Sequence, residues 1–368
     1  MKIVTIIGAR PQFIKAASLS REISKANNIQ EVIVHTGQHF DPNMSDIFFE
    51  EMKIPKPKYN LEIHSLGHGA MTGRMLEKIE AVLKIEKPDW LLVYGDTNST
   101  LAGALAAKKL HIKVAHIEAG LRSFNMKMPE EVNRILTDRI SDLLFCPTDE
   151  AVNNLKNEGY DDFDSKVENV GDIMYDSALF YNNLLEERHV KIKEEYILAT
   201  IHRAENTNNQ LKLVQIFKAL DLLNETYKVV LPIHPRTKQY LDQYNIITTI
   251  TLIDPVGYLD MIALITNSIA VITDSGGLQK EAYFFKKRCF TLRDQTEWVE
   301  IVKLGCNTLI DVLNEDISYV ILSKIKTKSD FSKQIYGKGD ASKKILKSLL
   351  HVHKLKILKD KRNSFISN

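Results

Sequence analysis

The amino-acid sequence predicts an α/β protein built from two doubly wound, Rossmann-like domains in series. The chain has 368 residues, more than a single hydrophobic core comfortably supports. Short apolar runs alternate with helix-length amphipathic segments, which is typical of a parallel sheet covered by helices on both faces. Because this alternation occurs twice along the chain, we expect one such sheet in each half.

The first series of expected strands lies in the N-terminal half. Each strand is a short and nearly continuous apolar run, as expected for a strand buried on both faces. The strands are expected at residues 2–8, 31–37, 90–96, 113–119 and 142–148. Helical patterns lie between them, for example at residues 70–87 and 100–110.

The second series begins after a charged stretch, residues 182–195, that has no strand pattern. We place the hinge near residues 170–176, so that the first domain spans residues 1–172 and the second spans residues 173–349. A last helix, at about residues 350–368, is expected to pack back onto the first domain. The second series of strands is expected at residues 196–202, 227–235, 250–254, 269–277 and 288–294.

Composition and charge exclude several classes of function. Hydrophobic residues make up 44% of the chain, charged residues 26%, and the net charge of +2 gives no electrostatic case for a nucleic-acid partner. No apolar run is long enough to span a bilayer, and Met1 leads into a short strand pattern rather than a signal peptide. We therefore expect a cytoplasmic protein with neither a nucleic-acid nor a membrane partner.

The cysteines and the C-terminal lysines fit the same conclusion. Cys146, Cys289 and Cys306 lie too far apart in sequence for a zinc motif or a disulfide framework, so we expect buried thiols of a reducing compartment. Residues 343–361 mix Ile and Leu at helical spacing with Lys, which favours an amphipathic closing helix over a membrane anchor.

Polar residues gather where the expected strands end. The strand ends run into "IIGARPQ", "VYGDTNST", "HIEAGLR", "ATIHRAEN", "PIHPRT" and "TDSGG", three in each domain. Ligands of doubly wound sheets bind outside the carboxyl ends of the strands. The sequence therefore predicts a cleft that is lined from both domains.

The first strand–helix junction is a candidate anion site. In "GARPQFIK" (8–15), Pro11 suits a first helical turn, and Arg10 and Lys15 bring positive charge to the start of the helix. The segment suits either a phosphate-binding loop or a structural turn. It matches neither the dinucleotide fingerprint nor the P-loop, which lowers the odds of a dinucleotide or ATP as ligand.

A second candidate anion site lies in "TDSGGLQKEA". Ser275, Gly276 and Gly277 present backbone N–H groups at a helix start, where the helix dipole favours an anion. Glu281 lies one turn inside the helix, placed to accept two hydroxyls of a ribose. Alone, the segment is better explained as an N-cap followed by a surface glutamate.

Three further strand ends carry candidate side chains. Asp96 in "YGDTNST" either caps the following helix or takes part in chemistry. His202 in "IHR" and His234 in "IHP" are either core histidines or groups that face the cleft. Together with the Ser-Gly-Gly segment, these histidines favour a diphosphate or nucleotide pocket.

One stretch, "HIEAGLRSFNMKMPEEVNR", follows an expected strand and carries Glu118, Glu130 and Glu131. Each glutamate has an arginine nearby in sequence. Taken alone, such a stretch is better explained as solvated loop charge than as a group of acid/base residues.

In this order along the chain, six segments resemble the motifs of non-hydrolysing UDP-N-acetylglucosamine 2-epimerases. They are "GARPQFIK", "GDTNST", "HIEAGLRSFNMKMPEEVNR", "IHRAEN", "HPRT" and "TDSGGLQKEA", and the resemblance runs from about Ile6 to Asn307. It implies a GT-B-like fold with the active site in the cleft between the domains and UDP bound mainly by the second domain.

The reaction of that family explains why carboxylates would gather at a strand end. The C2 proton of a UDP-sugar is poorly acidic, so the resemblance implies that UDP is eliminated. A base takes the C2 proton, and a 2-acetamidoglucal remains beside UDP. Protonation on the opposite face and re-addition of UDP give the other epimer. This path needs acid/base groups on both faces of the ring and cations around the leaving diphosphate.

The resemblance also assigns roles to individual residues. The acid/base carboxylates are Asp96, Glu118 and Glu130, with Glu131 ranked below its neighbour, and His202 assists the leaving phosphate. The residues expected to bind the UDP-sugar are Arg10, Lys15, Glu131, His234, Ser275, Gly276, Gly277 and Glu281. No metal and no cofactor are expected, because the hydrogen leaves C2 as a proton.

Two departures from the family pattern bear on the substrate. Trp298 in "RDQTEWVE" stands where many UDP-N-acetylglucosamine enzymes carry arginine in "TERPE". Phe40 in "GQHFDPNM" stands where "QHR" is common, in the region of the allosteric nucleotide-sugar site of some bacterial enzymes. Both variants look like a branch that includes 2-epimerases for UDP-2,3-diacetamido-2,3-dideoxyglucuronate.

We therefore expect a homodimeric isomerase that interconverts UDP-N-acetylglucosamine and UDP-N-acetylmannosamine for surface polysaccharide synthesis. The diacetamidoglucuronate is the alternative substrate. A hydrolysing relative and a GT-B glycosyltransferase are alternative enzymes, although a glycosyltransferase would leave the three carboxylates without a role. A nucleotide-binding module without activity would need no proton-transfer groups at all.

Overall fold

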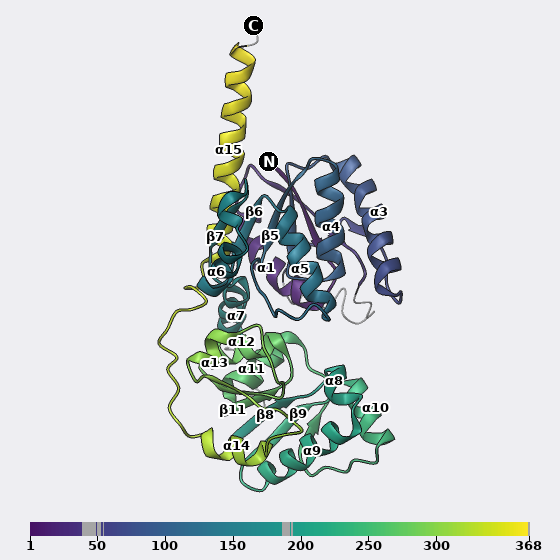
Figure 1. Ribbon diagram of the computed structural model, residues 1–368, viewed down its shortest axis with the longest axis vertical. Coiled ribbons are helices and arrows are strands. Elements are labelled where there is room, and N and C mark those ends of the chain that lie inside the picture. Colours follow the sequence, from purple (N-terminus) through teal and green to yellow (C-terminus); the bar gives the residue numbers. More distant parts are fainter. Residues whose placement is uncertain (39–48, 50–52, 54, 186–191, 193, 367–368) are drawn as a thin grey trace. The chain divides into compact units, whose positions relative to one another are not determined.

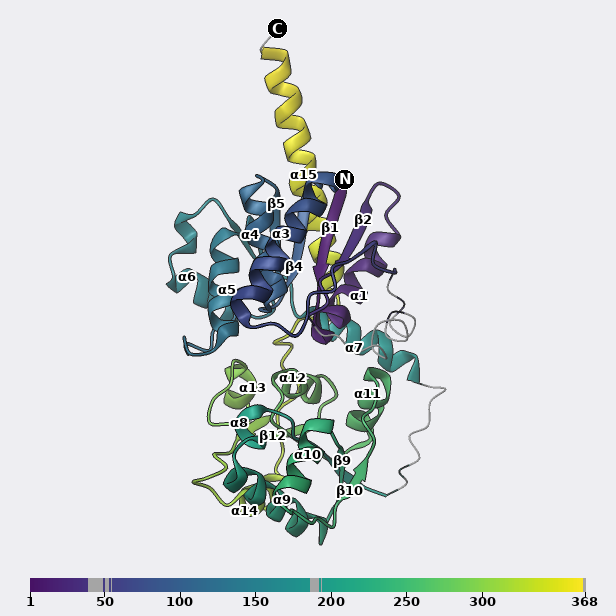
Figure 2. The same ribbon diagram turned by 90° about the vertical axis from the view of Figure 1, so that its right-hand side faces the viewer.

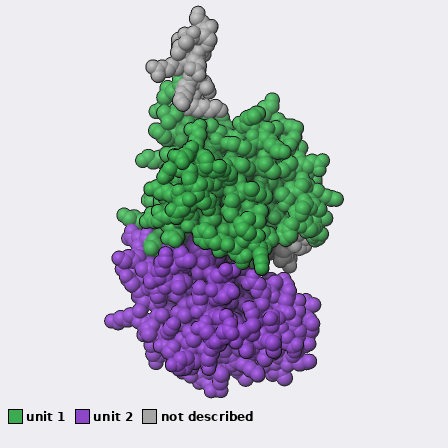
Figure 3. Space-filling view, in the orientation of Figure 1, with its two compact units in different colours: residues 1–177, 335–368 green, residues 178–334 purple. Residues whose placement is uncertain are grey.

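The computed structural model describes residues 1–38, 49, 53, 55–185, 192 and 194–366 (Figure 1). Phe40 lies outside the described residues. The chain forms two compact units, coloured separately in Figure 3: unit 1 comprises residues 1–177 and 335–368, and unit 2 comprises residues 178–334. Two α/β units in series confirm the predicted fold class.

The described part of unit 1 holds a seven-stranded parallel sheet in the order β3-β2-β1-β4-β5-β6-β7. Its strands are β1 (Lys2–Ile7), β2 (Gln30–His35), β3 (Tyr59–Asn60), β4 (Trp90–Tyr94), β5 (Lys113–Ile117), β6 (Leu143–Cys146) and β7 (Lys166–Asn169). Figure 2 shows β1 between β2 and β4, and the register places Val4 beside Val32 and Leu91. The strand order reverses between β1 and β4, which makes their carboxyl ends the switch point of the sheet.

Helices cover both faces of this sheet. They are α1 (Arg10–Ser24), α3 (His68–Glu86), α4 (Asn98–Lys109), α5 (Pro129–Ile140), α6 (Asp149–Asn157), the 3₁₀ turn η1 (Tyr160–Asp162), the start of α7 (Ile173–Asn183) and α15 (Ala341–Ile366). On one face, Val4 and Ile6 of β1 pack with Met75 and Ile79 of α3 and with Ala102 of α4. Helix α15 contacts α1 and buries Ile345 and Leu349, as expected for an amphipathic closing helix (Figure 1).

In unit 2, the described residues form a six-stranded parallel sheet in the order β10-β9-β8-β11-β12-β13, with its switch point between β8 and β11. Its strands are β8 (Tyr196–Thr200), β9 (Lys228–Pro232), β10 (Thr251–Ile253), β11 (Ala270–Thr273), β12 (Arg288–Thr291) and β13 (Asn307–Leu309). Its helices are α8 (Ala204–Thr207), α9 (Gln210–Asn224), α10 (Pro235–Gln243), α11 (Tyr258–Asn267), α12 (Gly276–Phe284), α13 (Val299–Lys303) and α14 (Ile317–Lys324).

The core of unit 2 lies on both faces of its sheet. Ile197 of β8 packs with Phe217 of α9 and Ile321 of α14 on one face. On the other face, Leu198 of β8 packs with Leu264 of α11 and Ala282 of α12. Successive strand residues therefore point into opposite cores, which is why the strands appear in the sequence as nearly unbroken apolar runs.

All ten strands expected from the sequence are present, with the ends shifted by a few residues. The expectation missed β3, β7 and β13, which lie at the edges of the two sheets. The burial of β7 shows why, because its two middle residues are only half-buried and its two end residues are exposed. An edge strand of this kind carries no apolar run.

The structure divides the chain at 177/178 and 334/335, whereas the sequence suggested 172/173 and 349/350. The start of α7 is held in unit 1, because the Ser177 hydroxyl lies 2.8 Å from that of Ser18 and donates to the Ile14 carbonyl at 2.7 Å. The start of α15 is held there too, since Asp176 accepts bonds from the Ala341 and Ser342 N–H groups at 3.1 and 2.8 Å. These polar contacts between distant segments leave no local mark in the sequence.

Two other sequence expectations concern the cysteines and membrane-spanning helices. Cys146, Cys289 and Cys306 are buried and form no disulfide. None of the described helices combines the length and the apolar character of a bilayer-spanning segment.

A buried carboxylate in unit 1 provides a test of this packing. Glu86 ends α3 and accepts from Lys58 and Tyr59, each at 2.6 Å, while Lys2 of β1 lies 2.5 Å away. The contacts with Lys2, then Lys58, then Tyr59 lower the pKa of Glu86 to about 2. Because the folded pKa lies below the unfolded value, this stabilisation is complete above about pH 4.5 and is lost as the pH falls through about 2.

We therefore expect Glu86→Gln to lower the free energy of unfolding at pH 7 by about 1–2 kcal/mol, a figure reduced because Lys58 is exposed to solvent. Urea unfolding at a series of pH values measures this. The difference between variant and parent should narrow between about pH 4.5 and pH 2, and a difference that stays constant over that range would contradict the assignment.

Candidate active site

Glu118, which follows β5, has a backbone conformation that few residues other than glycine adopt. Its φ is +74°, in the left-handed region, which Gly95 (φ +62°) and Gly120 (φ +79°) also occupy. A left-handed residue other than glycine costs on the order of 1 kcal/mol, so the surrounding structure must hold it. Strain of this kind concentrates at functional sites.

The carboxylate of Glu118 forms an ion pair with Lys15 of α1. Both side chains are more than nine-tenths buried. They pass directly over Gly95, where an added Cβ would lie 3.0 Å from Lys15 Nζ and 3.2 Å from a Glu118 oxygen. The pair therefore needs glycine at this position. It also places Lys15, expected to bind the UDP-sugar, beside an expected acid/base group.

Asp96 lies in the loop after β4, next to the switch point. Thr97, not Asp96, caps α4, because its hydroxyl accepts from the Thr100 N–H at 3.3 Å. The Asp96 carboxylate forms an ion pair with Arg134 of α5, and its side chain keeps 30% of its surface exposed. The capping role that the sequence left open thus falls to Thr97, and Asp96 remains accessible.

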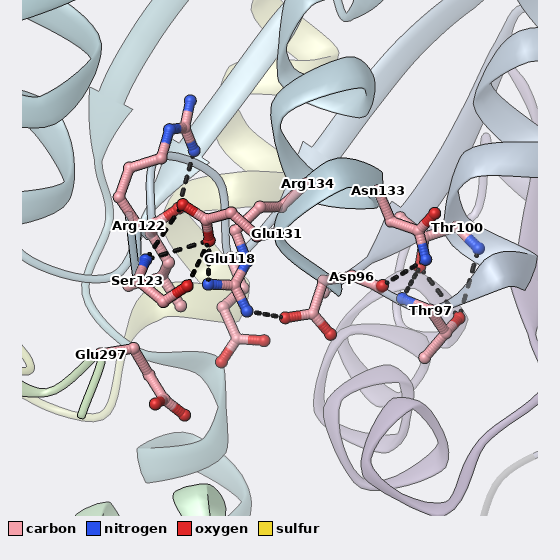
Figure 4. A network of polar contacts seen from close by, with 12 residues as sticks. Asp96, Thr97, Thr100, Glu118, Arg122, Ser123, Glu131, Asn133, Arg134 and Glu297 are labelled. Carbon is pink, nitrogen blue, oxygen red and sulfur yellow. Dashed lines mark hydrogen bonds and ion pairs between the residues drawn. The ribbon is translucent and has the colours of Figure 1, made fainter. Parts of the chain in front are cut away.

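Glu130 and Glu131 are neighbours in the first turn of α5 but differ completely in environment. Glu131 is fully buried and accepts from the Ser123 N–H and hydroxyl, the Phe124 N–H and Arg134, at 2.8–3.1 Å. Figure 4 shows Arg134 between Glu131 and Asp96. Glu130 is exposed at the helix start, where the helix dipole stabilises an anion. The structure therefore gives Glu131 a supporting role and leaves Glu130 accessible.

A buried ionic network lies beneath these groups, and the sequence analysis missed it. His116 of β5 is completely buried, with Nδ1 2.6 Å from Asp138 Oδ1 and Nε2 2.7 Å from the Gly95 carbonyl. Asp138 of α5 also accepts from the Gly120 N–H at 3.1 Å and from Arg122 at 2.7 Å. The alternation of β5 marks His116 only as one more inward residue, so no local signal pointed to this role.

The junction between β1 and α1 is capped by a side chain. Gln12 accepts from the Gly8 and Ala9 N–H groups at 2.8 and 3.0 Å and donates to the Tyr94 carbonyl at 2.8 Å. These two backbone donors therefore serve the fold, which favours the structural turn over a backbone phosphate loop. Arg10, the first residue of α1, is half-buried.

Unit 2 brings His202 and His234 together at the ends of adjacent strands β8 and β9. Their ring centroids are 6.0 Å apart. His234 caps α10 by accepting from the Arg236 N–H at 3.2 Å. Burial, and then the nearby His202 and Arg236, lower the pKa of His234, which agrees with a neutral ring in this role. Both histidines keep exposed surface, so neither is a core histidine.

The loop that carries His202 is fixed by a second buried aspartate. Asp274 accepts from the N–H groups of His202 (3.1 Å) and Arg203 (3.0 Å) and from Asn206 (3.2 Å), and its side chain is fully buried. Asp274 stands directly before the Ser-Gly-Gly segment in the sequence, which gives no local sign of this role.

The Ser-Gly-Gly segment begins α12, as expected. The Ser275 N–H donates to the Thr273 hydroxyl at 2.9 Å, and Gly277 is exposed with open space where a Cβ would be. A Cβ on Gly276 would lie 2.4 Å from a Glu297 oxygen and 3.8 Å from a terminal nitrogen of Arg203. One acidic and one basic side chain therefore lie beside the start of α12. Glu281 lies one turn further on and is buried.

Within each unit, the expected residues gather at the switch point. Arg10, Lys15, Asp96 and Glu118 lie around the ends of β1, β4 and β5, and His202, His234 and Ser275 follow β8, β9 and β11. The cleft between the domains remains a prediction. Among the described residues, no group of three or more His, Cys, Asp or Glu side chains is arranged to hold a metal ion.

Comparisons with known proteins show which family this chain resembles. The family model for UDP-N-acetylglucosamine 2-epimerases matches residues 21–350. UDP-2,3-diacetamido-2,3-dideoxy-D-glucuronate 2-epimerase from Pseudomonas aeruginosa is 54% identical over 351 residues, covering 95% of this chain and 99% of that protein. A UDP-N-acetylglucosamine 2-epimerase homolog from Methanococcus maripaludis is 53% identical over 362 residues, with the same coverage.

A solved structure is also similar along nearly the whole chain. The crystal structure of Methanocaldococcus jannaschii UDP-GlcNAc 2-epimerase in complex with UDP-GlcNAc and UDP has a TM-score of 0.87 and 42% sequence identity. It covers 95% of this chain and 100% of that chain.

The contrast between Glu130 and Glu131 yields a matched pair of variants. Glu131→Gln removes a buried charge that holds the loop at Ser123 and Phe124, so we expect the free energy of unfolding to fall by about 3 kcal/mol. Glu130→Gln changes an exposed side chain and should leave it within about 0.5 kcal/mol of the parent. Chemical unfolding measures both, and equal losses would refute the assignment of separate roles.

Proposed function

Because this chain belongs to the UDP-N-acetylglucosamine 2-epimerase family, we propose that it inverts C2 of a UDP-2-acetamido sugar by eliminating UDP and adding it back. The observation that supports this most is the gathering of Asp96, Glu118 and Glu130 around the ends of β4 and β5 and the start of α5. Proton removal and return at one carbon is the chemistry that needs several carboxylates in one place.

The carboxylates of unit 1 carry the proton transfer. In the forward half-reaction the C1–O bond breaks, its electron pair leaves with UDP, and one carboxylate takes the C2 proton. A second carboxyl group, in its protonated form, then gives its proton to C2 from the other face while UDP adds back to C1. Lys15 holds Glu118, and Arg134 holds Asp96, each through an ion pair. Such fixed partners place the reacting oxygens before the substrate arrives, which lowers the cost of the transition state.

We assign the leaving UDP to unit 2, with Arg10 of unit 1 as an additional cation. The start of α12 offers the Gly276 and Gly277 N–H groups and the positive end of the helix dipole to the diphosphate. Glu281 accepts hydrogen bonds from the ribose hydroxyls. His202 lies at the end of the neighbouring strand β8, where it assists the departure of the phosphate, and His234 lies beside it.

Two UDP-sugars remain as substrates, and we favour UDP-2,3-diacetamido-2,3-dideoxy-D-glucuronate. The relative that carries this name is 54% identical to the chain over nearly its full length, and Trp298 departs from the arginine of many UDP-N-acetylglucosamine enzymes. UDP-N-acetylglucosamine is the second candidate, since a solved relative bound to it shares 42% identity. The proposal includes a cytoplasmic homodimer that supplies surface polysaccharide synthesis.

Incubation with each UDP-sugar in D₂O tests the reaction and the substrate together. We expect deuterium at C2 and a mixture of both C2 epimers, faster with the diacetamidoglucuronate, when the products are examined by NMR. Free 2-acetamido sugar with stoichiometric UDP would show the hydrolysing alternative. Turnover that needs an added acceptor would show a glycosyltransferase.

Amide variants separate the carboxylates in the same assay. Asp96→Asn, Glu118→Gln and Glu130→Gln should each lose about 10²–10⁴-fold in turnover while still binding UDP, because general acid–base groups contribute that much. A variant impaired only in reprotonation should release 2-acetamidoglucal and UDP, since elimination still runs. If all three lost activity only in proportion to lost stability, without released glucal, the carboxylates would have no catalytic role.

The UDP site in unit 2 has its own test. Glu281→Gln should weaken UDP binding by about 10–150-fold, the equivalent of losing a charge-assisted hydrogen bond worth about 1.5–3 kcal/mol. Calorimetric titration measures the affinity, with Glu194→Gln in the same unit as control, because Glu194 pairs with Lys228 on the surface. Equal UDP affinity of the Glu281 variant and the parent would place the ribose elsewhere.

A further inference from the structure

The ring of His116 faces an acceptor on each side. Nδ1 lies 2.6 Å from a carboxylate oxygen of Asp138, and Nε2 lies 2.7 Å from the carbonyl oxygen of Gly95. A carbonyl oxygen has no proton to donate, so Nε2 carries one. If Asp138 is ionised, Nδ1 carries a proton as well, and the ring is an imidazolium.

Asp138 has the surroundings of an ionised carboxylate. Burial alone would raise its pKa, but His116 and then Arg122 outweigh burial and hold the pKa of Asp138 below its usual range. Its two oxygens accept from His116, from Arg122 at 2.7 Å and from the Gly120 N–H at 3.1 Å. A buried carboxylate with three donors is satisfied as an anion.

These contacts tie together the segments that carry the three acid/base candidates. Through His116, Asp138 holds the Gly95 carbonyl, one residue before Asp96. Through its other oxygen it holds the Gly120 N–H, two residues after Glu118. Asp138 belongs to α5, the helix that also presents Glu130. Glu118 itself has a left-handed φ of +74°, which costs a residue other than glycine free energy, so its turn needs such restraint.

We propose that His116 and Asp138 form a buried imidazolium–carboxylate pair that positions Asp96, Glu118 and Glu130 relative to one another. Neither residue touches the substrate in this role, and both act through backbone groups of the catalytic turns. The inference rests on the proposed function for its kinetic consequence, but its structural claim, a doubly protonated His116, stands independently of activity.

The protonation of His116 is tested on the unaltered protein. NMR of protein labelled with ¹⁵N-histidine should show one ring, shielded from solvent exchange, in which both nitrogens carry a proton. Substitution of His116 by Gln assigns the signal by its loss. A His116 ring with one unprotonated nitrogen overturns the proposal, whatever the protein catalyses.

Kinetics test the positioning role with a matched pair of carboxylate-to-amide variants. Asp138→Asn should lower kcat by roughly 10²-fold, the effect expected when reacting groups shift by about 1 Å, while KM stays within about twofold. Glu86→Gln is the control, because Glu86 is also buried and ion-paired in unit 1 but bonds to Lys2, Lys58 and Tyr59 outside the site. It should lose stability and keep kcat.

The outcomes separate positioning from a merely structural role. A kcat for Asp138→Asn within twofold of the parent overturns the proposal. The proposal also fails if Glu86→Gln loses kcat along with stability, because the loss of kcat would then follow from destabilisation alone. If Asp138→Asn fails to fold, the same comparison is made with His116→Gln, which keeps a donor but removes the ring charge. Failure of the proposed function is seen separately, as absence of epimerisation by the unaltered protein.

Discussion

The carboxylate of Asp138 is the group on which the first half of the site depends. Removing a charge from water costs several kcal/mol, and an unpaired carboxylate at this depth would take up a proton. Here the cost is offset by one imidazole ring and one guanidinium, because His116 and Arg122 bond to the carboxylate directly. The same two oxygens also hold the Gly120 N–H, and His116 carries the restraint on to Gly95. Removing any one partner would weaken the compensation of this buried charge, so the arrangement is most stable when complete.

In unit 2, Asp274 has a role similar to that of Asp138. This aspartate is fully buried and accepts from the backbone of His202 and Arg203. In both units, therefore, a buried aspartate at or near a switch point bonds to backbone N–H groups of a turn that presents a candidate catalytic side chain. In each case the buried aspartate, and not the candidate catalytic side chain, bonds to the backbone of the turn. Glu131 shows the same division on a smaller scale, because it holds the loop at Ser123 and leaves Glu130 at the surface of the helix start.

The sequence was informative where the physical cause is local. Continuous apolar runs predicted the central strands, and polar strand ends predicted which side chains gather at each switch point. It was uninformative where a role depends on a distant partner: His116 and Asp138 are 22 positions apart, and Gln12 reaches Tyr94 across 82. Nor does periodicity distinguish Glu130 from Glu131, since both lie in one helical turn and only the loop packed against Glu131 separates them. The edge strands were missed for a related reason, because a half-exposed strand such as β7 has no apolar run to mark it.

The three candidate carboxylates occupy three different electrostatic environments, and epimerisation gives a reason for this. Glu118 is nearly buried against Lys15, Asp96 is partly exposed and shares Arg134 with Glu131, and Glu130 is exposed at the start of α5. A reaction that removes a proton from one face of a carbon and returns it to the other needs one group that is ionised and another that is protonated at the same moment. Carboxylates held close together repel one another. Lys15 beside Glu118 and Arg134 beside Asp96 reduce that repulsion before any substrate is bound.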